Sequence, residues 1–306
     1  MAQNQMNKLV WIVNTISKAG KISFEGINRK WRENEFLSGG QEMIKRTFHK
    51  WRDSIFDTFG LIIECEQGGL YRYYIRNSSE LRNGSLENCL LRTYSISNSL
   101  IESKSIKDKI VLEDIPSGVN FLAPIIDAMK TGAMIHITYF NYRRGDTLKH
   151  YVMPLCIKLF HQRWYVVGRS WPSGYTSVFC LDRIVDFRLS SHKFVYPEDF
   201  DAEEFFQGCF GVIADTTIPV EHVVLKATAD QSNYLRDLPM HATQIERERH
   251  EDYSIFELDI RPTYDFKQEI LKYVEKLEVL KPVWLREEIA GIVQRMLNKY
   301  NNKETE

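Results

Sequence analysis

The sequence predicts a multidomain α+β protein in which a helical unit with a terminal β-hairpin, a small β-barrel and a βαββαβ domain follow one another. Three observations predict this fold class. Apolar residues recur at helical spacing over the first 60 residues, five strand patterns crowd into about 60 residues in the middle of the chain, and strands alternate with helices in the last third. With 306 residues, of which 43% are hydrophobic and 26% charged, the chain can bury two or three ordinary cores.

The N-terminal region is predicted to contain three helices. The first spans Asn7–Lys18, where apolar residues lie three or four positions apart, and Gly20 follows as a stop. Ser23 is of a residue type that caps helix N-termini, so a second helix is expected after it. A third helix is expected after a Ser-Gly-Gly break and runs from Gln41 to Phe59, where Gly60 ends it.

A β-hairpin is predicted directly after the third helix. Its strands are Leu61–Glu66 and Leu70–Arg76, and Gly68-Gly69 supplies the tight turn between them. Three helices followed by a β-hairpin make up a winged helix-turn-helix. We therefore predict a winged helix-turn-helix domain over residues 1–76.

A helical connector is expected over residues 77–131, and its last helix spans Leu122–Thr131. Strand patterns then follow closely over residues 132–196. The five predicted strands cover residues 133–140, 149–160, 163–170, 175–181 and 184–190. Five short strands in so few residues are typical of a small barrel.

The last region, residues 197–306, is predicted to fold as a ferredoxin-like domain, because its elements alternate in the order βαββαβ. The strands are expected at 220–227, 244–249, 253–260 and 278–280, and the helices at 232–238 and 266–277. A closing helix, Pro282–Tyr300, has its apolar residues on one face. This face has two possible partners, its own domain or a second subunit.

Charge is distributed unevenly along the chain. Residues 1–75 hold 11 Lys and Arg against 8 Asp and Glu, residues 76–196 hold 16 against 10, and residues 197–306 hold 13 against 23. Phosphate affinity comes largely from Lys and Arg, so nucleic-acid contact is expected in the first two thirds.

The five cysteines are far apart and form no CxxC pair, so neither a disulfide framework nor a zinc site is indicated. No apolar stretch is long enough to span a bilayer, and the start lacks the layout of a secretory signal. We therefore expect a cytoplasmic protein without membrane contact, and we predict no cofactor and no metal.

The third predicted helix divides into an apolar and a basic face. Cations and polar groups gather within eight positions of it: Lys45, Arg46, Thr47, His49, Lys50 and Arg52. Such a helix can bury one face on its neighbours and present the other to the DNA major groove, where Arg contacts guanine and Lys contacts phosphate. The alternative is a solvated charged helix, but the preceding helices and the following hairpin favour DNA.

On the hairpin, Arg72 is a candidate for contact with the adjacent minor groove or a phosphate. Three tyrosines surround it, Tyr71, Tyr73 and Tyr74. Packing of these rings onto the third helix is an equally good interpretation.

The middle region resembles a known family at four places in the expected order. The triplet Trp164-Tyr165-Val166 resembles the Trp-Tyr-Leu motif that names the WYL domain, with Val at its third position. Upstream, ITYFNYRRG and YVMPL resemble the first two strands of that domain, and CLDRI at 180–184 resembles its closing segment. The chain is thus similar to the WYL-domain-containing transcriptional regulators.

The resemblance continues into the C-terminal region, where YLRDLP, the turn at Glu251-Asp252 and EVLKPVWLREEI resemble the extension usual in these regulators. It implies an Sm-like β-barrel that binds a ligand, often suggested to be a nucleotide or a nucleic-acid fragment. The implied ligand-binding residues are Tyr139, His150, Trp164, Tyr165, Arg169 and Arg183, with Arg169 the looser match. Cys180 stands where many members have Arg, which implies a less cationic or differently selective pocket.

Structural roles compete with these assignments. Strand aromatics bury large areas, so Trp164 and Tyr165 are also candidates for packing. Arg183 has possible ion-pair partners in Asp182 and Asp186. The sequence contains no HExxH, GxGxxG, GxxxxGK[ST] or GxSxG run, which argues against a metalloprotease, a P-loop nucleotidase and an α/β-hydrolase.

The leading functional hypothesis is a regulator that binds double-stranded operator DNA as a homodimer and acts as a repressor, with a ligand at the WYL domain that alters its DNA affinity. One alternative is an enzyme acting on nucleotides or RNA, with Tyr139, His150 and Arg183 as its cluster. Another is an interaction module that does not bind DNA.

Overall fold

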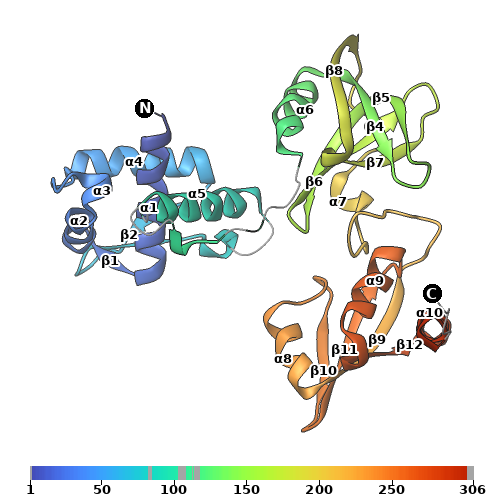
Figure 1. Cartoon of the computed structure of the whole chain (residues 1–306). Helices are drawn as coiled ribbons and strands as arrows, with labels where there is room; N and C mark the ends of the chain where they lie inside the picture. The colour runs from blue at the N-terminus through green and yellow to red at the C-terminus, as the bar shows by residue number, and fades with distance from the viewer. Residues whose placement is uncertain (1, 82–84, 103–107, 112, 114–117, 302–306) are drawn as a thin grey trace. The chain divides into compact units, whose positions relative to one another are not determined.

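The structure, a computed structural model, describes residues 2–81, 85–102, 108–111, 113 and 118–301. The chain divides into two compact units, residues 1–113 and 114–306 (Figure 1). The division lies within the range predicted as a connector. Within that range, residues 82–84, 103–107, 112 and 114–117 lie outside the described residues.

Unit 1 consists of helices and a three-stranded antiparallel sheet. The helices are α1 (Ala2–Ala19), α2 (Phe24–Glu33), α3 (Glu35–Ser38), α4 (Lys45–Phe59) and α5 (Leu86–Glu102). The strands are β1 (Ile22–Ser23), β2 (Ile63–Cys65) and β3 (Arg72–Ile75), in the order β1-β3-β2. The Ser23 hydroxyl accepts a hydrogen bond from the Gly26 amide at 3.1 Å and caps α2, as expected. Gly60 ends α4 with a positive φ of 63°, which favours glycine.

Three details of unit 1 differ from the sequence prediction, and one of them is the short helix α3 (Glu35–Ser38), which was not predicted. Helix α4 begins at Lys45 instead of Gln41, because the Met43 amide donates to the Asn28 side chain at 2.7 Å and the Met43 side chain is buried. Strand β1 was not predicted. Its two residues pair with β3 and are too few to show strand periodicity.

The core of unit 1 holds the apolar faces of α1, α2 and α4 together. Its fully buried side chains include Ile12, Ile16, Ile27, Phe48, Ile55 and Phe59. The Phe48 ring meets the Tyr73 ring of β3 edge-on, with 4.8 Å between centroids, so α4 is fixed against the sheet. Helix α5 adds the buried Leu91 to this core and therefore belongs to unit 1.

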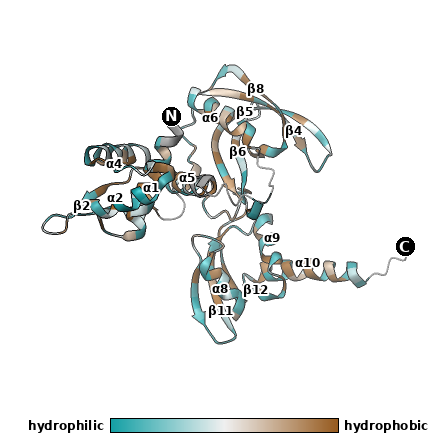
Figure 2. Cartoon of the chain, turned by 60° about the vertical axis from the view of Figure 1, so that its left-hand side comes forward, coloured by the Kyte–Doolittle hydropathy of each residue, from teal (hydrophilic) through white to brown (hydrophobic). Residues whose placement is uncertain are grey.

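The first part of unit 2 is a helix followed by a five-stranded antiparallel sheet. Its elements are α6 (Val119–Thr131), β4 (Ala133–Asn141), β5 (Asp146–Phe160), β6 (Arg163–Ser170), β7 (Thr176–Cys180), a 3-10 turn η3 (Leu181–Arg183) and β8 (Ile184–Lys193). The strand order is β7-β6-β5-β4-β8, so the last strand returns to the first. Apolar residues, brown in Figure 2, recur along β4, β5 and β6 and pack with Ile125 and Ala128 of α6 in one core.

The second part of unit 2 is a four-stranded antiparallel sheet with its own core. After α7 (Ala202–Phe205) come β9 (Glu221–Thr228), α8 (Ala229–Asp237), β10 (Ile245–Arg249), β11 (Tyr253–Ile260), α9 (Tyr264–Lys272), a 3-10 turn η4 (Val274–Lys276), β12 (Leu277–Lys281) and α10 (Val283–Asn301). The strand order is β10-β11-β9-β12. Leu235 of α8 and Phe266 of α9 pack on one face of the sheet with Leu225 and Leu258.

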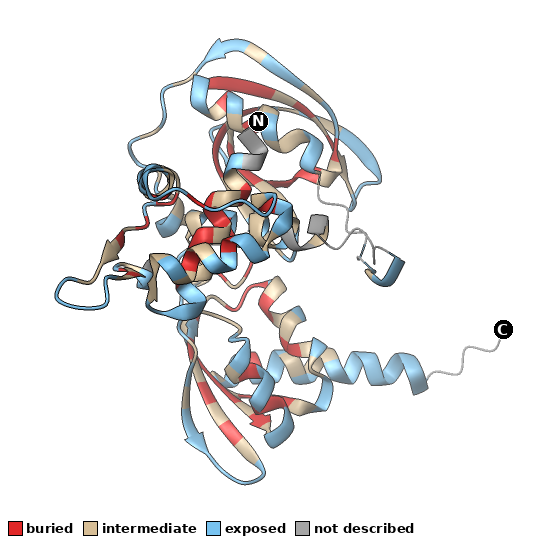
Figure 3. Cartoon of the chain, turned by 90° about the vertical axis from the view of Figure 1, so that its left-hand side faces the viewer, coloured by how far each residue is buried: buried red, intermediate tan, exposed pale blue. Residues whose placement is uncertain are grey.

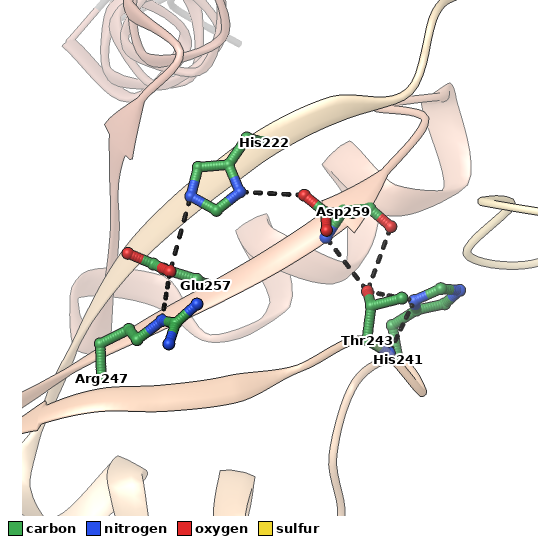
Figure 4. A network of polar contacts seen from close by, with 6 residues as sticks. All are labelled: His222, His241, Thr243, Arg247, Glu257 and Asp259. Carbon is green, nitrogen blue, oxygen red and sulfur yellow. Dashed lines mark hydrogen bonds and ion pairs between the residues drawn. The ribbon is translucent and has the colours of Figure 1, made fainter.

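The other face of this sheet carries an ion-pair network (Figure 4). His222 lies 2.9 Å from Asp259 and 3.6 Å from Glu257, and Arg247 lies 2.6 Å from the same Glu257 carboxylate. The Arg247 side chain holds the pKa of Glu257 below its usual value. The network links β9, β10 and β11 across this face.

Helix α10 is mostly exposed, as its pale blue colour in Figure 3 shows. Only Leu285 near its start is buried, and Ile289 packs partly against the core. Among the helices of the described residues, none is long and apolar enough to cross a membrane.

Candidate functional site

The first two turns of α4 present an exposed basic surface. Lys45, Arg46, His49 and Lys50 are exposed, and their spacing places them along one side of the helix. The opposite side buries Phe48, Ile55 and Phe59 in the core of unit 1. The core therefore fixes which side of α4 faces solvent.

The cations at the start of α4 differ from Arg52 in their contacts. Within the described residues, no ion pair or hydrogen bond engages the side chains of Lys45, Arg46 and Lys50. Arg52 instead lies 3.4 Å from the His49 ring nitrogen and 5.7 Å from the centre of the Tyr73 ring. The start of α4 thus offers free positive charge, while Arg52 packs toward the sheet. Thr47 is half-buried between these groups.

Arg72 at the start of β3 is held in an ion pair. Its guanidinium lies 3.0 Å from Glu66, and Lys21 lies 2.9 Å from the other oxygen of the same carboxylate. Hydrogen bonds from Lys21 and Arg72 lower the pKa of Glu66. Of the nearby tyrosines, Tyr73 packs onto α4 as in the packing interpretation, whereas Tyr71 is 68% exposed.

Tyr139 and Arg183, which are far apart in the sequence, lie close together in the five-stranded sheet. Arg183 also contacts Phe140, 43 positions before it. The Tyr139 ring is buried, and its hydroxyl accepts a hydrogen bond from the Cys180 amide at 3.1 Å. The Arg183 guanidinium lies over the rings of Tyr139 and Tyr142, at 4.6 and 4.1 Å from their centres. It also donates to the Phe140 carbonyl through Nε at 3.1 Å and Nη2 at 2.7 Å. This contact replaces the ion pair with Asp182 or Asp186 that the sequence suggested.

A cavity of 460 Å³ opens beside this pair of residues. One wall consists of residues from the five-stranded sheet and the η3 turn: Tyr139, Tyr165, Thr176, Ser177, Val178, Cys180 and Arg183. The other wall comes from the segment before the C-terminal sheet: Phe205, Val212, Ile213, Ala214, Asp215 and Thr216. The volume lies within the range of small-molecule sites.

The cavity includes three of the six ligand-binding residues that the resemblance implies: Tyr139, Tyr165 and Arg183. The other three do not line it. His150 packs against the rings of Tyr139 and Phe179, and burial lowers its pKa. Trp164 packs against the core of the five-stranded sheet, and Arg169 pairs with Asp199 at 3.3 Å.

A polar cluster at the edge of the cavity was not predicted. Arg163 pairs with Asp182 at 2.5 Å, and the Cys180 thiol donates to the same carboxylate. Burial raises the pKa of Cys180 to about 11 and that of Tyr165 to about 12. Both groups are therefore protonated at neutral pH. Arg163 lies only one residue before the Trp-Tyr-Val motif, which is the signal that sequence reasoning left unused.

The second wall is fixed by contacts with both parts of unit 2. The Lys158 ammonium of β5 donates to the Gly211 carbonyl at 2.5 Å and lies 3.8 Å from the centre of the Phe206 ring. Asp265 at the start of α9 accepts hydrogen bonds from the amides of Val212 at 3.0 Å and Ile213 at 3.2 Å. The wall is thus attached to β5 of the five-stranded sheet and to α9 of the C-terminal sheet region.

Unit 1 has a cavity of its own, with a volume of 670 Å³. Its lining combines Lys18 and Lys30 with Glu33 and Glu35, so its charges balance. Nowhere in the described part of the chain do three His, Cys, Asp or Glu side chains gather as a metal site.

Two family models match unit 2. The WYL domain matches residues 120–189, which hold α6 and the five-stranded sheet up to β8. The WCX domain matches residues 219–297, which run from β9 into α10. A comparison with curated proteins found no match.

Two solved structures show distant likeness. The chain is similar to proteasome accessory factor B/C (PafBC) of Arthrobacter aurescens at 19% identity and a TM-score of 0.37, over 96% of this chain and 46% of that chain. This chain therefore spans about half the length of that one. It is also similar to a CRISPR Cas-related protein at 10% identity and a TM-score of 0.39, over 99% of this chain and 86% of that chain.

Both TM-scores lie below 0.5, so these likenesses carry no argument about function. The two domain matches coincide with the two sheets of unit 2 and with the motifs at 164–166 and 180–184. The chain therefore contains a WYL domain followed by a WCX domain.

Proposed function

We propose that this protein is a DNA-binding transcriptional regulator that represses its target, with α4 of unit 1 in the major groove. The observation that carries the proposal is the group of exposed, unpaired cations Lys45, Arg46 and Lys50 on a helix whose other side is buried. A helix fixed in this way can place Arg and Lys against base edges and phosphates without rearrangement. The WYL domain supports the assignment to a regulator.

The finer fold assignments belong to the same proposal. Helices followed by the β2–β3 hairpin support a winged helix-turn-helix at 1–76. A helix and five strands, with β8 back beside β4, support an Sm-like barrel at 132–196. The order β10-β11-β9-β12 supports a ferredoxin-like domain at 197–306, and residues 77–131 connect the DNA-binding and barrel domains.

Regulation is proposed to act through the barrel cavity and a homodimer. A ligand in the cavity changes DNA affinity if it binds the DNA-competent and DNA-incompetent states differently, and a coupling of about 1–3 kcal/mol is usual. Two copies would place two winged helices on paired half-sites, which multiplies sequence discrimination.

The enzyme alternative lacks a supporting observation. It needs Tyr139, His150 and Arg183 to act on a substrate, but the Tyr139 hydroxyl accepts from Cys180 and the Arg183 guanidinium donates to a backbone carbonyl. The His150 ring packs between aromatic rings.

The proposal is tested by selecting genomic DNA fragments with the purified full-length protein and measuring their binding by fluorescence anisotropy. We expect the double variant Arg46→Ala/Lys50→Ala to lose affinity, with about 1–3 kcal/mol for each lost bidentate base contact and a shallower salt dependence for each lost phosphate contact. The matched control is Arg295→Ala/Lys299→Ala, which removes the same two charges from exposed positions of α10. Equal effects of the two double variants would refute α4 as the DNA-contacting helix.

A further inference from the structure

The positive and negative charges that line the barrel cavity cancel, and this limits the kind of ligand that the cavity can bind. Its ionisable lining residues are Tyr139, Tyr165, Cys180, Arg183 and Asp215. Burial raises the pKa of both tyrosines and of the cysteine, so these three are neutral at pH 7. Hydrogen bonds from Thr217 lower the pKa of Asp215, which is therefore ionised. One positive and one negative charge remain.

Three arginines on β6 and η3 are already engaged by partners within the chain. Arg163 is paired with Asp182, Arg169 with Asp199, and Arg183 with the Phe140 carbonyl. A chain of phosphates would have to displace these partners, which leaves carboxylates or a carbonyl without a donor. Cys180, which stands where a cation was expected, adds no charge to offset that loss.

The second wall offers groups that suit ligand hydroxyls. Asp215 uses Oδ1 to accept from the Thr217 amide at 3.0 Å and hydroxyl at 2.6 Å, while among the described residues Oδ2 has no hydrogen-bond partner. Thr176, Ser177 and Thr216 add three hydroxyl groups to the lining. A carboxylate oxygen beside hydroxyls accepts hydrogen bonds from alcohols and repels phosphate.

The first wall offers an aromatic surface and one remaining donor. Tyr165 contributes a neutral phenol, and the Arg183 Nη1 is not used in the contact with the Phe140 carbonyl. These groups suit a flat heterocycle with a carbonyl or ring nitrogen as acceptor.

We propose that the cavity binds an uncharged nucleoside-like compound, with its hydroxyl-bearing ring at Asp215 and its heterocycle between Tyr165 and Arg183, and that it does not select for oligonucleotides. This inference rests on the proposed ligand-sensing role of the WYL domain and names the ligand class for that same site.

The ligand class is tested by thermal shift and calorimetry on the full-length protein. The probes are adenosine, guanosine, cytidine and uridine, their 5′-monophosphates, and the dinucleotide pApA. At least one nucleoside should stabilise the protein more than its monophosphate and more than pApA, with little dependence on salt. The proposal is overturned if no nucleoside binds, or if the dinucleotide binds more tightly with a steep salt dependence.

A variant pair places the binding in this cavity. Asp215→Asn should weaken nucleoside binding by about tenfold, the loss that corresponds to one hydrogen bond to a charged group, and should strengthen binding of the monophosphate. Asp186→Asn removes the same charge from an exposed position on β8, where Asp186 pairs with Arg188 at 3.2 Å, and should change neither. Equal behaviour of the two variants would overturn the assignment to this cavity.

The outcome can be separated from that of the proposed function. DNA affinity of the parent and of both variants is measured in the absence of nucleoside. If the parent does not bind DNA, the regulator proposal is overturned, whereas the nucleoside titration still tests the ligand class. Normal DNA binding without any nucleoside response would overturn only the ligand class.

Discussion

At the scale of single residues, unit 1 contains two kinds of cation. Those at the start of α4 have no partner within the described residues, whereas Lys21 and Arg72 share the Glu66 carboxylate. Exposed cationic side chains that have no partner can neutralise phosphates directly, whereas those in ion pairs must first separate from their carboxylate. Lys21 and Arg72 should therefore contribute less to DNA affinity than unpaired cations at the same positions would.

Glu66→Gln should accordingly tighten DNA binding. The substitution leaves the shape of the side chain and removes the charge that holds Lys21 and Arg72, so up to two further cations become available to phosphates. Each neutralised phosphate adds about −0.9 to the slope of log affinity against log salt. Anisotropy titrations at several salt concentrations measure this slope.

The control for this prediction is Glu278→Gln, which removes the same charge from an exposed ion pair with Arg286 in the C-terminal domain. It should leave the slope unchanged. A Glu66→Gln variant with unaltered affinity and slope would show that the wing cations do not approach DNA.

A motif in the sequence marks some residues of the cavity, whereas others are placed there only by tertiary contacts. Tyr139 and Arg183 lie in the strand and turn that the resemblance indicated, and they meet in the structure. No sequence motif points to Asp215. Its place in the cavity wall depends on Lys158 and Asp265, which lie more than 45 residues away in either direction.

At the scale of elements, sequence periodicity predicted the strands of the five-stranded sheet well and helix boundaries less well. The buried residues of β4 recur at alternate positions, Ile135, Ile137 and Tyr139, and this period is visible in the sequence. The start of α4 was wrong by four residues because one side-chain hydrogen bond, from the Met43 amide to Asn28, holds the preceding segment extended. Such a contact between distant residues leaves no periodic trace.

The segment that forms the second cavity wall is anchored to α9 through Asp265, and this anchor can be removed by one substitution. Asp265→Ala removes the acceptor for the amides of Val212 and Ile213. Loss of a partner for a buried donor costs about 1–3 kcal/mol, and here less, because Ile213 is 36% exposed. The wall should open more often, while the barrel strands keep their own hydrogen bonds.

Hydrogen exchange on the full-length protein measures this local effect. Amides in residues 209–217 should exchange faster in Asp265→Ala, while those of β4 and β5 keep their parent rates. Asp259→Ala serves as the control, since Asp259 pairs only with exposed groups on the open face of the C-terminal sheet. Unchanged exchange in 209–217 would contradict the anchoring role of Asp265.

At the scale of the whole molecule, the structure has three apolar cores that follow one another along the chain. The sequence does not reveal that α5 packs with unit 1 while α6 packs with the five-stranded sheet, since both helices carry the same kind of apolar face. Which core receives such a face is decided by shape complementarity, which one sequence does not display.

The exposed apolar face of α10 is where we expect the two copies of a dimer to meet. Val293, Met296, Leu297 and Tyr300 lie on one side of the helix and are 48–86% exposed. Burying apolar area of this kind is worth about 25 cal/mol per Å², so exposure on each of two copies favours association.

Light scattering at micromolar concentration should report about twice 36.0 kDa for the parent. Val293→Asp/Leu297→Asp should give a monomer, because an aspartate in an apolar interface would be buried without a partner. Arg295→Asp/Lys299→Asp, on the opposite side of the same helix, should remain dimeric. The monomeric variant should also lose affinity for a paired operator site while it retains the weaker binding of a single half-site, since each winged helix is unchanged. A monomeric parent, or a dimer that survives both aspartates on the apolar side, would place the contact elsewhere.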